Sequence, residues 1–320
     1  VSLTQALANP VVAQITVTSD IDLSAATLEE LSFTEHKTIE IEEGATIQMG
    51  KGNRLTAENG LTLIGQGTID NTSADNSDIG QGIQKSLIHV MSGDCIVDGV
   101  TLINDAAYHW HGTSYNSAAI AYWNDANVTI NNAKIISGEF TICGMGRSTA
   151  SGTITLTDSY FESTSSSKNN DIHWAYAMRL FGSKVRINNC EVKGIQGGVS
   201  IEGCQDAIID GGKYYPVNSP GNTDAYYPLY ITNGAIVTIT DGEFSAANDR
   251  SGGLAEGTSA VVSGDNDVNL PTGSVTLLGG KFSGKAYNDE TRTVYEPADG
   301  YQWQAITGSD NLKWEVVPVE

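Results

Sequence analysis

Short runs of alternating apolar and polar residues recur along the chain, and each is followed by a turn and a second short run. Val128–Ile130, Val185–Ile187 and Val237–Ile239 place branched apolar side chains on one side and Thr or Arg on the other. This is the pattern of a β-strand with one buried face. Because no run of helical period separates these strands, a layered α/β sheet is disfavoured.

A five-residue phrase follows the strands and repeats along the chain. A polar residue is followed by Gly, Asn, Asp or Ser, then by a small residue, a polar residue and a large apolar residue. Gly, Asn and Asp, at the second position of the phrase, tolerate left-handed backbone angles. The phrase therefore predicts a tight turn between two strands. The apolar residues that end the successive copies are Ile69, Leu102, Ile135, Phe161, Val192, Tyr214, Phe244 and Phe282.

The spacing of the phrase predicts a solenoid. The steps between the terminal apolar residues are 33, 33, 26, 31, 22, 30 and 38 residues, and periods of roughly 20–50 residues are typical of stacked repeats. Strands so arranged pair with the equivalent strands of the next repeat, which gives an all-β parallel β-helix. We expect one inward-facing ladder to contain Ile130, Leu156, Ile187, Ile209 and Ile239.

The irregular steps favour the right-handed form, because left-handed β-helices keep a strict hexapeptide rhythm. Residues 13–285 resemble the right-handed parallel β-helix proteins of the pectin-lyase-like superfamily, and Leu61–Asp70 is similar to the phrase that opens many of them. Gly279–Gly284, Asp299–Tyr301 and Trp314–Pro318 are similar to surface β-helix proteins of gut bacteria. The resemblance implies a fold more strongly than an activity, since one fold hosts many functions.

Both ends of the solenoid are expected to carry caps. Ser2 and Gln5 fit a helical capping box, and Leu3, Leu7 and Val11 would share one face of a short helix. The phrase disappears near the C-terminus, where Tyr and Trp residues gather. We therefore predict a helical cap over 1–12, a β-helix over 13–285 and a small C-terminal cap over 286–320.

The charge of the chain narrows its possible partners. Acidic residues number 38 against 17 basic ones, for a formal charge of −21, so binding to nucleic acid is disfavoured. An acidic surface attracts Ca²⁺, but the Asp spacing of an EF-hand or of glycine-aspartate nonapeptides is absent. We therefore expect no cofactor, with Ca²⁺ as the alternative.

Further features of the sequence predict a secreted or cell-surface protein. The chain has no run of 18 apolar residues and starts at Val1 without Met, which is consistent with removal of an export signal. Cys95, Cys143, Cys190 and Cys204 lack zinc spacing and are interpreted as buried thiols, with disulfides as the alternative. We expect a monomer.

The longest insertions all follow the repeated phrase at the same phase, over residues 71–85, 104–117, 163–175, 216–228 and 246–258. Equal phase in a stack of coils places them on one side of the solenoid, where repeat proteins usually bind ligands. These insertions are rich in aromatic residues, which suit the apolar faces of sugar rings, although the same rings can also fold inward as small cores.

The strands that follow the insertions supply the candidate ligand-binding residues. When these strands are aligned with one another, their outward-facing residues form columns that run from coil to coil. In these columns Thr141 lies beside Ala121, and Cys143 lies beside Trp123. Arg179 and Glu202 are one coil apart, so Glu202 would orient Arg179 toward a sugar, or the two would form an ion pair on a solvated face. The candidate ligand-binding residues are His89, Trp110, Trp123, Trp174, Arg179, Glu202 and Tyr230.

The evidence for catalysis is weaker. A glycoside hydrolase needs two carboxyl groups roughly 5–9.5 Å apart, for which Glu202 and Asp171 are the candidates, with Glu139 behind them. A polysaccharide lyase needs a base, for which Arg179 is the candidate. His173 is a further catalytic candidate. His109 and His111 share a face, but no third ligand is evident, so no metal site is predicted.

The sequence therefore predicts an extracytoplasmic β-helix protein that binds a polysaccharide or host glycan in a loop-walled groove, as an adhesin does. The alternatives are a polysaccharide lyase, a glycoside hydrolase and a purely structural spacer.

Overall fold

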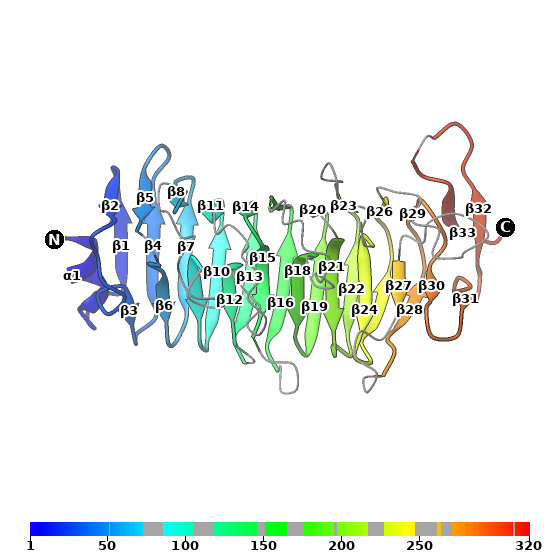
Figure 1. Cartoon of the computed structure of the whole chain (residues 1–320), viewed down its shortest axis with the longest axis horizontal. Coiled ribbons are helices and arrows are strands. Elements are labelled where there is room, and N and C mark those ends of the chain that lie inside the picture. Colours follow the sequence, from blue (N-terminus) through cyan, green and yellow to red (C-terminus); the bar gives the residue numbers. More distant parts are fainter. Residues whose placement is uncertain are drawn as a thin grey trace. The chain divides into compact units, whose positions relative to one another are not determined.

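The computed structural model describes residues 1–50, 52–72, 86–104, 118–123, 125–145, 151–164, 176–194, 197–216, 227–246, 261–263, 271–309 and 311–320 (Figure 1). The chain divides into two compact units, Val1–Ser167 and Lys168–Glu320. In both units the strands belong to three sheets, named A, B and C in the order in which the chain visits them.

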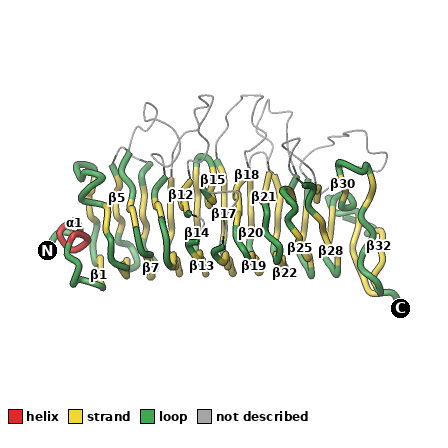
Figure 2. Tube along the Cα trace, turned by 90° about the horizontal axis from the view of Figure 1, so that it is seen from below, coloured by secondary structure: helices red, strands yellow, loops and turns green. Residues whose placement is uncertain are grey.

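The first unit begins with helix α1 (Leu3–Ala8) and continues as parallel β-sheets, whose strands lie side by side in successive coils (Figure 2). Sheet A contains β1 (Gln14–Val17), β4 (Lys37–Ile41), β7 (Leu61–Gly65), β10 (Asp94–Asp98), β13 (Asn127–Asn131) and β16 (Thr153–Thr157). Sheet B contains β2 (Ile21–Leu23), β5 (Thr46–Met49), β8 (Thr68–Asp70), β11 (Thr101–Asn104), β14 (Lys134–Ser137) and β17 (Tyr160–Ser163). Sheet C contains β3 (Ser32–Phe33), β6 (Leu55–Ala57), β9 (Ile88–Val90), β12 (Ala118–Tyr122) and β15 (Phe140–Gly144).

The second unit repeats this plan. Its sheet A contains β19 (Lys184–Asn188), β22 (Ala207–Asp210), β25 (Ile236–Ile239) and β28 (Ser274–Leu277). Its sheet B contains β20 (Glu191–Gly194), β23 (Lys213–Pro216), β26 (Glu243–Phe244) and β29 (Lys281–Phe282), followed by the antiparallel strands β33 (Trp314–Pro318) and β32 (Tyr301–Ala305). Its sheet C contains β18 (Tyr176–Phe181), β21 (Gly197–Glu202), β24 (Leu229–Thr232), β27 (Val261–Ser263), β30 (Tyr287–Asn288) and the antiparallel β31 (Thr293–Val294).

These sheets confirm the predicted all-β, parallel β-helix fold. The repeated phrase forms the turn between sheets A and B, and its second residue has positive φ in five copies: Gly99 (79°), Asn132 (51°), Asp158 (48°), Asn189 (48°) and Gly211 (75°). Glycine, asparagine and aspartate occupy this place because they tolerate the left-handed region. The turn then delivers the next strand to sheet B at each coil.

The inward-facing residues stack as the sequence predicts. In sheet A of the first unit Ile130 pairs with Leu156, and in the second unit Ile187, Ile209 and Ile239 follow one another in register. All five side chains are buried. In sheet B of the second unit, the stacked rings of Tyr214, Phe244 and Phe282 have centroids 4.8 Å and 5.2 Å apart. The cores are therefore built from like residues in neighbouring coils.

Helix α1 packs against the first coil. Ser2 Oγ accepts a hydrogen bond from the Gln5 backbone N–H, and Gln5 Oε1 accepts one from the Ser2 N–H, which is the expected capping box. The buried Lys37 Nζ donates to the carbonyl oxygens of Asn9 and Val12 at 2.7 Å and 2.6 Å, and so ties the end of the helical segment to β4.

The prediction that Leu3, Leu7 and Val11 share a buried face of this helix is wrong for Val11. Leu3 and Leu7 are buried, whereas Val11 is exposed. The helix ends at Ala8 because Asn9 has an extended backbone and precedes Pro10, a residue that disfavours helical angles before it. At the other end, the Trp303 ring of the β32–β33 hairpin meets the Phe282 ring edge-on at 5.3 Å. The domain boundaries at residues 12 and 285 stay predictions.

All four cysteines are buried thiols. Cys190 lies in the small slot of the phrase, where its thiol contacts the Asn188 carbonyl oxygen at 3.3 Å. Over the described ranges, no helix is long and apolar enough to cross a membrane.

Candidate functional site

Sheet C differs from the other two sheets because both faces of its middle strands, from β9 to β27, are buried. In sheet A, strands such as β13 and β19 alternate buried positions with exposed or half-buried ones. In sheet C, by contrast, every residue of β12, β15, β18, β21 and β24 is buried. The outward side chains of sheet C therefore occupy an interior environment, in which polar groups need partners.

The register places the outward residues of sheet C in columns. In the second unit Arg179 pairs with Ser200 and Ser200 with Tyr230, as expected. In the first unit His89 pairs with Ala121, and Ala121 pairs with Cys143. The expected position of Thr141 beside Ala121 is wrong by two residues, because β12 begins at Ala118 and pairs there with Phe140.

Arg179 and Glu202 form a buried ion pair. Arg179 Nε lies 2.7 Å from Glu202 Oε1, and Nη2 lies 3.3 Å from Oε2. The Ser200 hydroxyl is 3.3 Å from Glu202 Oε1, and the Arg179 guanidinium lies 4.9 Å from the Phe181 ring centroid. The predicted contact is confirmed, but the side chains are 8% and 1% exposed, so the pair does not lie on a solvated face.

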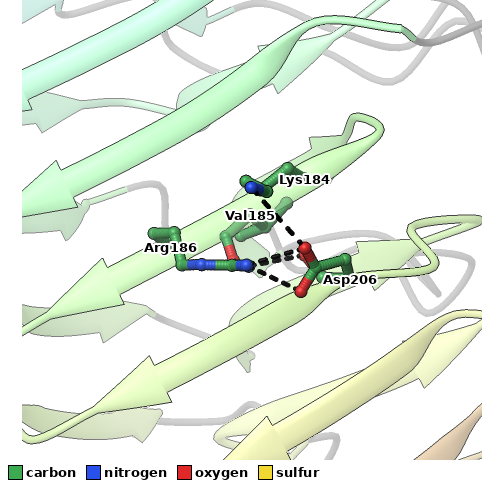
Figure 3. Close-up of polar contacts among 4 residues, drawn as sticks. All are labelled: Lys184, Val185, Arg186 and Asp206. Carbon is green, nitrogen blue, oxygen red and sulfur yellow. Dashed lines mark hydrogen bonds and ion pairs between the residues drawn. The ribbon is translucent and has the colours of Figure 1, made fainter.

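A second arginine pair shows what a solvated arrangement looks like in this protein. On sheet A, Arg186 Nη2 donates to both carboxylate oxygens of Asp206 at 2.7 Å, and Lys184 Nζ lies 3.8 Å from the same carboxylate (Figure 3). The Arg186 and Asp206 side chains are 29% and 49% exposed. The hydrogen bond from Arg186 lowers the pKa of Asp206.

Tyr230 belongs to a group of tyrosine rings. Its centroid lies 5.9 Å from that of Tyr176 and 6.3 Å from that of Tyr227, with interplanar angles of 26° and 13°. Tyr176 and Tyr230 are buried, and Tyr227 is half-buried. The ring proposed to face a sugar therefore also takes part in a stack within the protein.

His89 and Trp123 meet on sheet C of the first unit. Trp123 Nε1 lies 2.6 Å from His89 Nε2. Because an indole N–H only donates, Nε2 is the acceptor, and the neutral His89 ring carries its proton on Nδ1. Burial, with a further contribution from the positive charge of Arg54, lowers the pKa of His89 to about 4. Trp123 is half-buried.

The polar atoms without a partner gather at sheet C. Within the described residues, the buried side-chain atoms that lack a hydrogen bond are Nε and Nη1 of Arg54, Oγ of Ser86, Nδ1 of His89 and Oγ1 of Thr232. His89 and Thr232 lie in β9 and β24, Arg54 immediately precedes β6, and Ser86 lies two residues before β9. A native structure leaves few such groups, so the atoms of Arg54 and His89, which are neighbours in the first unit, mark a place where a polar ligand fits. Thr232 belongs to the second unit.

Sequence reasoning missed Arg54, Ser86 and Thr232. Arg54 precedes the alternating run Leu55–Ala57 at an outward position, which is a signal that was available. Asp171, His173, Trp110 and Trp174 lie outside the described residues, as does the segment that contains His109 and His111. Within the part of the chain that is described, no group of three His, Cys, Asp or Glu side chains is placed to hold a metal ion.

We expect the stability of the fold to fall as His89 becomes protonated. The folded-state pKa of about 4 lies below the ordinary 6.5, so the unfolded chain takes up the proton first. His89 thus contributes stability above about pH 6.5, and that contribution is lost as the pH falls toward 4, on the order of 2 kcal/mol. Urea unfolding at about pH 7 and about pH 4.5 checks this by comparison with His89→Gln, which should lose less stability. An equal loss in both proteins would contradict it.

Among protein-family models none matches the chain, and among curated proteins none matches its sequence. The fold resembles two crystal structures of the periplasmic alginate epimerase AlgG, one of a double mutant and one of a single mutant. Each shares 8% sequence identity with this chain, covers 82% of it and 78% of the epimerase chain, and has a TM-score of 0.38.

Proposed function

We propose that the chain binds a polysaccharide or host glycan on the outer face of sheet C, outside the cytoplasm and in the manner of an adhesin. One observation carries the proposal. Sheet C buries its outward side chains, and the unpaired buried polar side-chain atoms of the described residues all lie in it or within two residues of its strands. A ligand with many hydroxyl groups would satisfy such atoms, and the Trp123 ring offers an apolar surface beside them.

The geometry of a β-helix favours a long ligand over a small one. Neighbouring strands of a sheet lie about 4.8 Å apart, so a chain of sugars that runs along the coils meets one outward residue after another. In the second unit the column Arg179, Ser200 and Tyr230 supplies a guanidinium, a hydroxyl and a phenol in successive coils.

The described residues favour binding over catalysis. Within the described strands of sheet C, Glu202 is the one carboxylate, and its oxygens contact Arg179 and Ser200. A hydrolase would need a second carboxyl group nearby, and Asp171 lies outside the described residues. The ion pair also stabilises the charged guanidinium of Arg179, which is the opposite of what a base requires.

The proposal predicts retention of a glycan without a product. The purified protein is tested against immobilised plant and host polysaccharides, while new reducing ends and unsaturated-product absorbance are followed in solution. Trp123→Ala should lower affinity about tenfold, since it removes a ring and its contact with His89. Thr129→Ala, on the outer face of sheet A, is the matched control.

Three outcomes would contradict the proposal. Unsaturated products would indicate a lyase, and new reducing ends without unsaturated products would indicate a hydrolase. Full affinity of Trp123→Ala would remove the outer face of sheet C of the first unit as the binding surface.

A further inference from the structure

Arg54 and His89 are neighbours on the outer face of sheet C. Leu55 pairs with Ile88 and Thr56 with His89, and the Leu55 N–H donates to the Leu87 carbonyl oxygen at 3.0 Å. Leu55 and Ala57 are buried and face the core, so Arg54 continues the outward alternation of Thr56. Arg54 is therefore diagonal to His89, a separation of about 7–8 Å that long side chains bridge.

The groups gathered here are hydrogen-bond donors without acceptors. Arg54 presents Nε–H and Nη1–H, and His89 presents Nδ1–H, because its Nε2 accepts from Trp123. Three N–H groups of this kind match an oxyanion, whose oxygens only accept.

Among the described residues, no carboxylate forms an ion pair with Arg54. Partial burial lowers the pKa of Arg54, whereas a nearby acidic group would raise it. The positive charge also contributes to the lowered pKa of His89, which is consistent with their closeness. The Arg54 side chain is half-buried, and its buried Nε and Nη1 atoms have no partner, which costs stability. A protein that only needed to fold would gain from an apolar side chain at this position.

We propose that Arg54 and His89 form a subsite for one oxyanion of an acidic sugar, either a uronate carboxylate or a sulfate ester. This inference rests on the proposed function and narrows its ligand to glycans that carry acidic groups. Arg54 supplies the charge and two donors, and His89 adds a neutral N–H.

The net charge of the protein limits which acidic glycan fits. A chain with a formal charge of −21 repels a dense polyanion at long range. A short oligosaccharide with few charges avoids most of this repulsion, and the salt of an ordinary buffer screens the remainder beyond about 8 Å. We therefore expect short acidic oligosaccharides to bind more tightly at moderate salt than at low salt.

Titration calorimetry with defined oligosaccharides tests the subsite. The probes are short oligomers of galacturonate, glucuronate and mannuronate, their neutral methyl esters, and sulfated and unsulfated galactose oligomers. The protein should prefer the acidic member of one pair at least tenfold, and the preferred pair identifies the oxyanion as carboxylate or sulfate. Arg54→Met should abolish the preference, whereas Arg186→Met, which removes the same charge from sheet A, should keep it.

Thermal unfolding separates a binding role of Arg54 from a structural one. Because Arg54→Met replaces a half-buried charge, whose buried Nε and Nη1 atoms lack partners, by an apolar side chain of similar length, Tm should rise by about 2–4 °C without ligand. Equal affinity for acid and ester, together with unchanged affinity of Arg54→Met, would overturn the subsite and leave the proposed function standing. A lower Tm for Arg54→Met with an intact preference would also overturn it. Failure to bind any oligosaccharide, acidic or neutral, would overturn both.

Discussion

Ile187→Asp is expected to prevent the second unit from folding. Ile187 is 1% exposed and pairs in register with Ile209 inside the core of the β-helix. The substitution leaves a cavity and places an unpaired carboxylate among apolar side chains, so we expect a loss of at least about 5 kcal/mol of stability. Urea unfolding followed by circular dichroism measures the loss.

Two further variants keep this prediction testable even if Ile187→Asp yields no soluble protein. Ile187→Val should fold and lose about 0.5–1.5 kcal/mol. Thr238→Asp introduces the same carboxylate at a half-buried, outward position of β25 in the same sheet and should change stability little. Similar losses for Thr238→Asp and Ile187→Asp would contradict the assignment of inward and outward faces.

The sequence predicts the fold of this protein because the fold repeats local chemistry. The left-handed turn at Asn132, Asp158 and Asn189 needs residues of a particular kind, and these recur at each coil. The apolar residue that ends the phrase is buried in each copy, from Ile69 to Phe282. Both signals lie within five residues of one another, so neither depends on contacts between distant parts of the chain.

The candidate site is less predictable because it depends on register and on burial. Position in the sequence suggested that Thr141 lies beside Ala121, whereas the paired strands begin at Ala118 and Phe140. Strands that alternate apolar and polar residues are expected to expose the polar side chains to solvent. In β18 and β21 of sheet C, however, the side chains on both faces are buried. The outward position of Arg54 can be read from the alternation of Leu55–Ala57, but nothing local in the sequence shows that its Nε and Nη1 atoms are buried without a partner.

The buried Arg179 of sheet C and the half-buried Arg54, which precedes β6, differ in how their charge is compensated. Arg179 in β18 has a carboxylate partner in Glu202 of the neighbouring strand β21, and Arg179 Nε lies 2.7 Å from Glu202 Oε1. Arg54 has two buried N–H groups without any partner. A paired charge can serve structure alone, whereas an unpaired one stabilises nothing in the described protein. This contrast is why the ligand subsite is proposed at Arg54 rather than at Arg179.

Glu202→Leu is expected to destabilise the second unit strongly. The substitution removes the carboxylate that contacts the Arg179 side chain, which is itself 8% exposed, and so breaks a buried ion pair. Breaking a buried pair in this way costs about 3–5 kcal/mol. Urea unfolding of the single variant measures the cost, which should be about the same for Arg179→Met, because that variant breaks the same pair from the other side.

The double variant shows whether the loss of stability comes from the lost ion pair itself or from the buried charge that each single variant leaves behind. Replacing both residues, as Arg179→Met with Glu202→Leu, removes the two charges together and should recover most of the stability, since apolar side chains of similar volume suit a buried site. The exposed pair on sheet A provides the comparison, because Arg186 and Asp206 are solvated and Asp206→Ala should therefore cause a much smaller loss. If the double variant is as unstable as the sum of the two single variants, the guanidinium is held by groups other than Glu202, and the pair does not act as a unit.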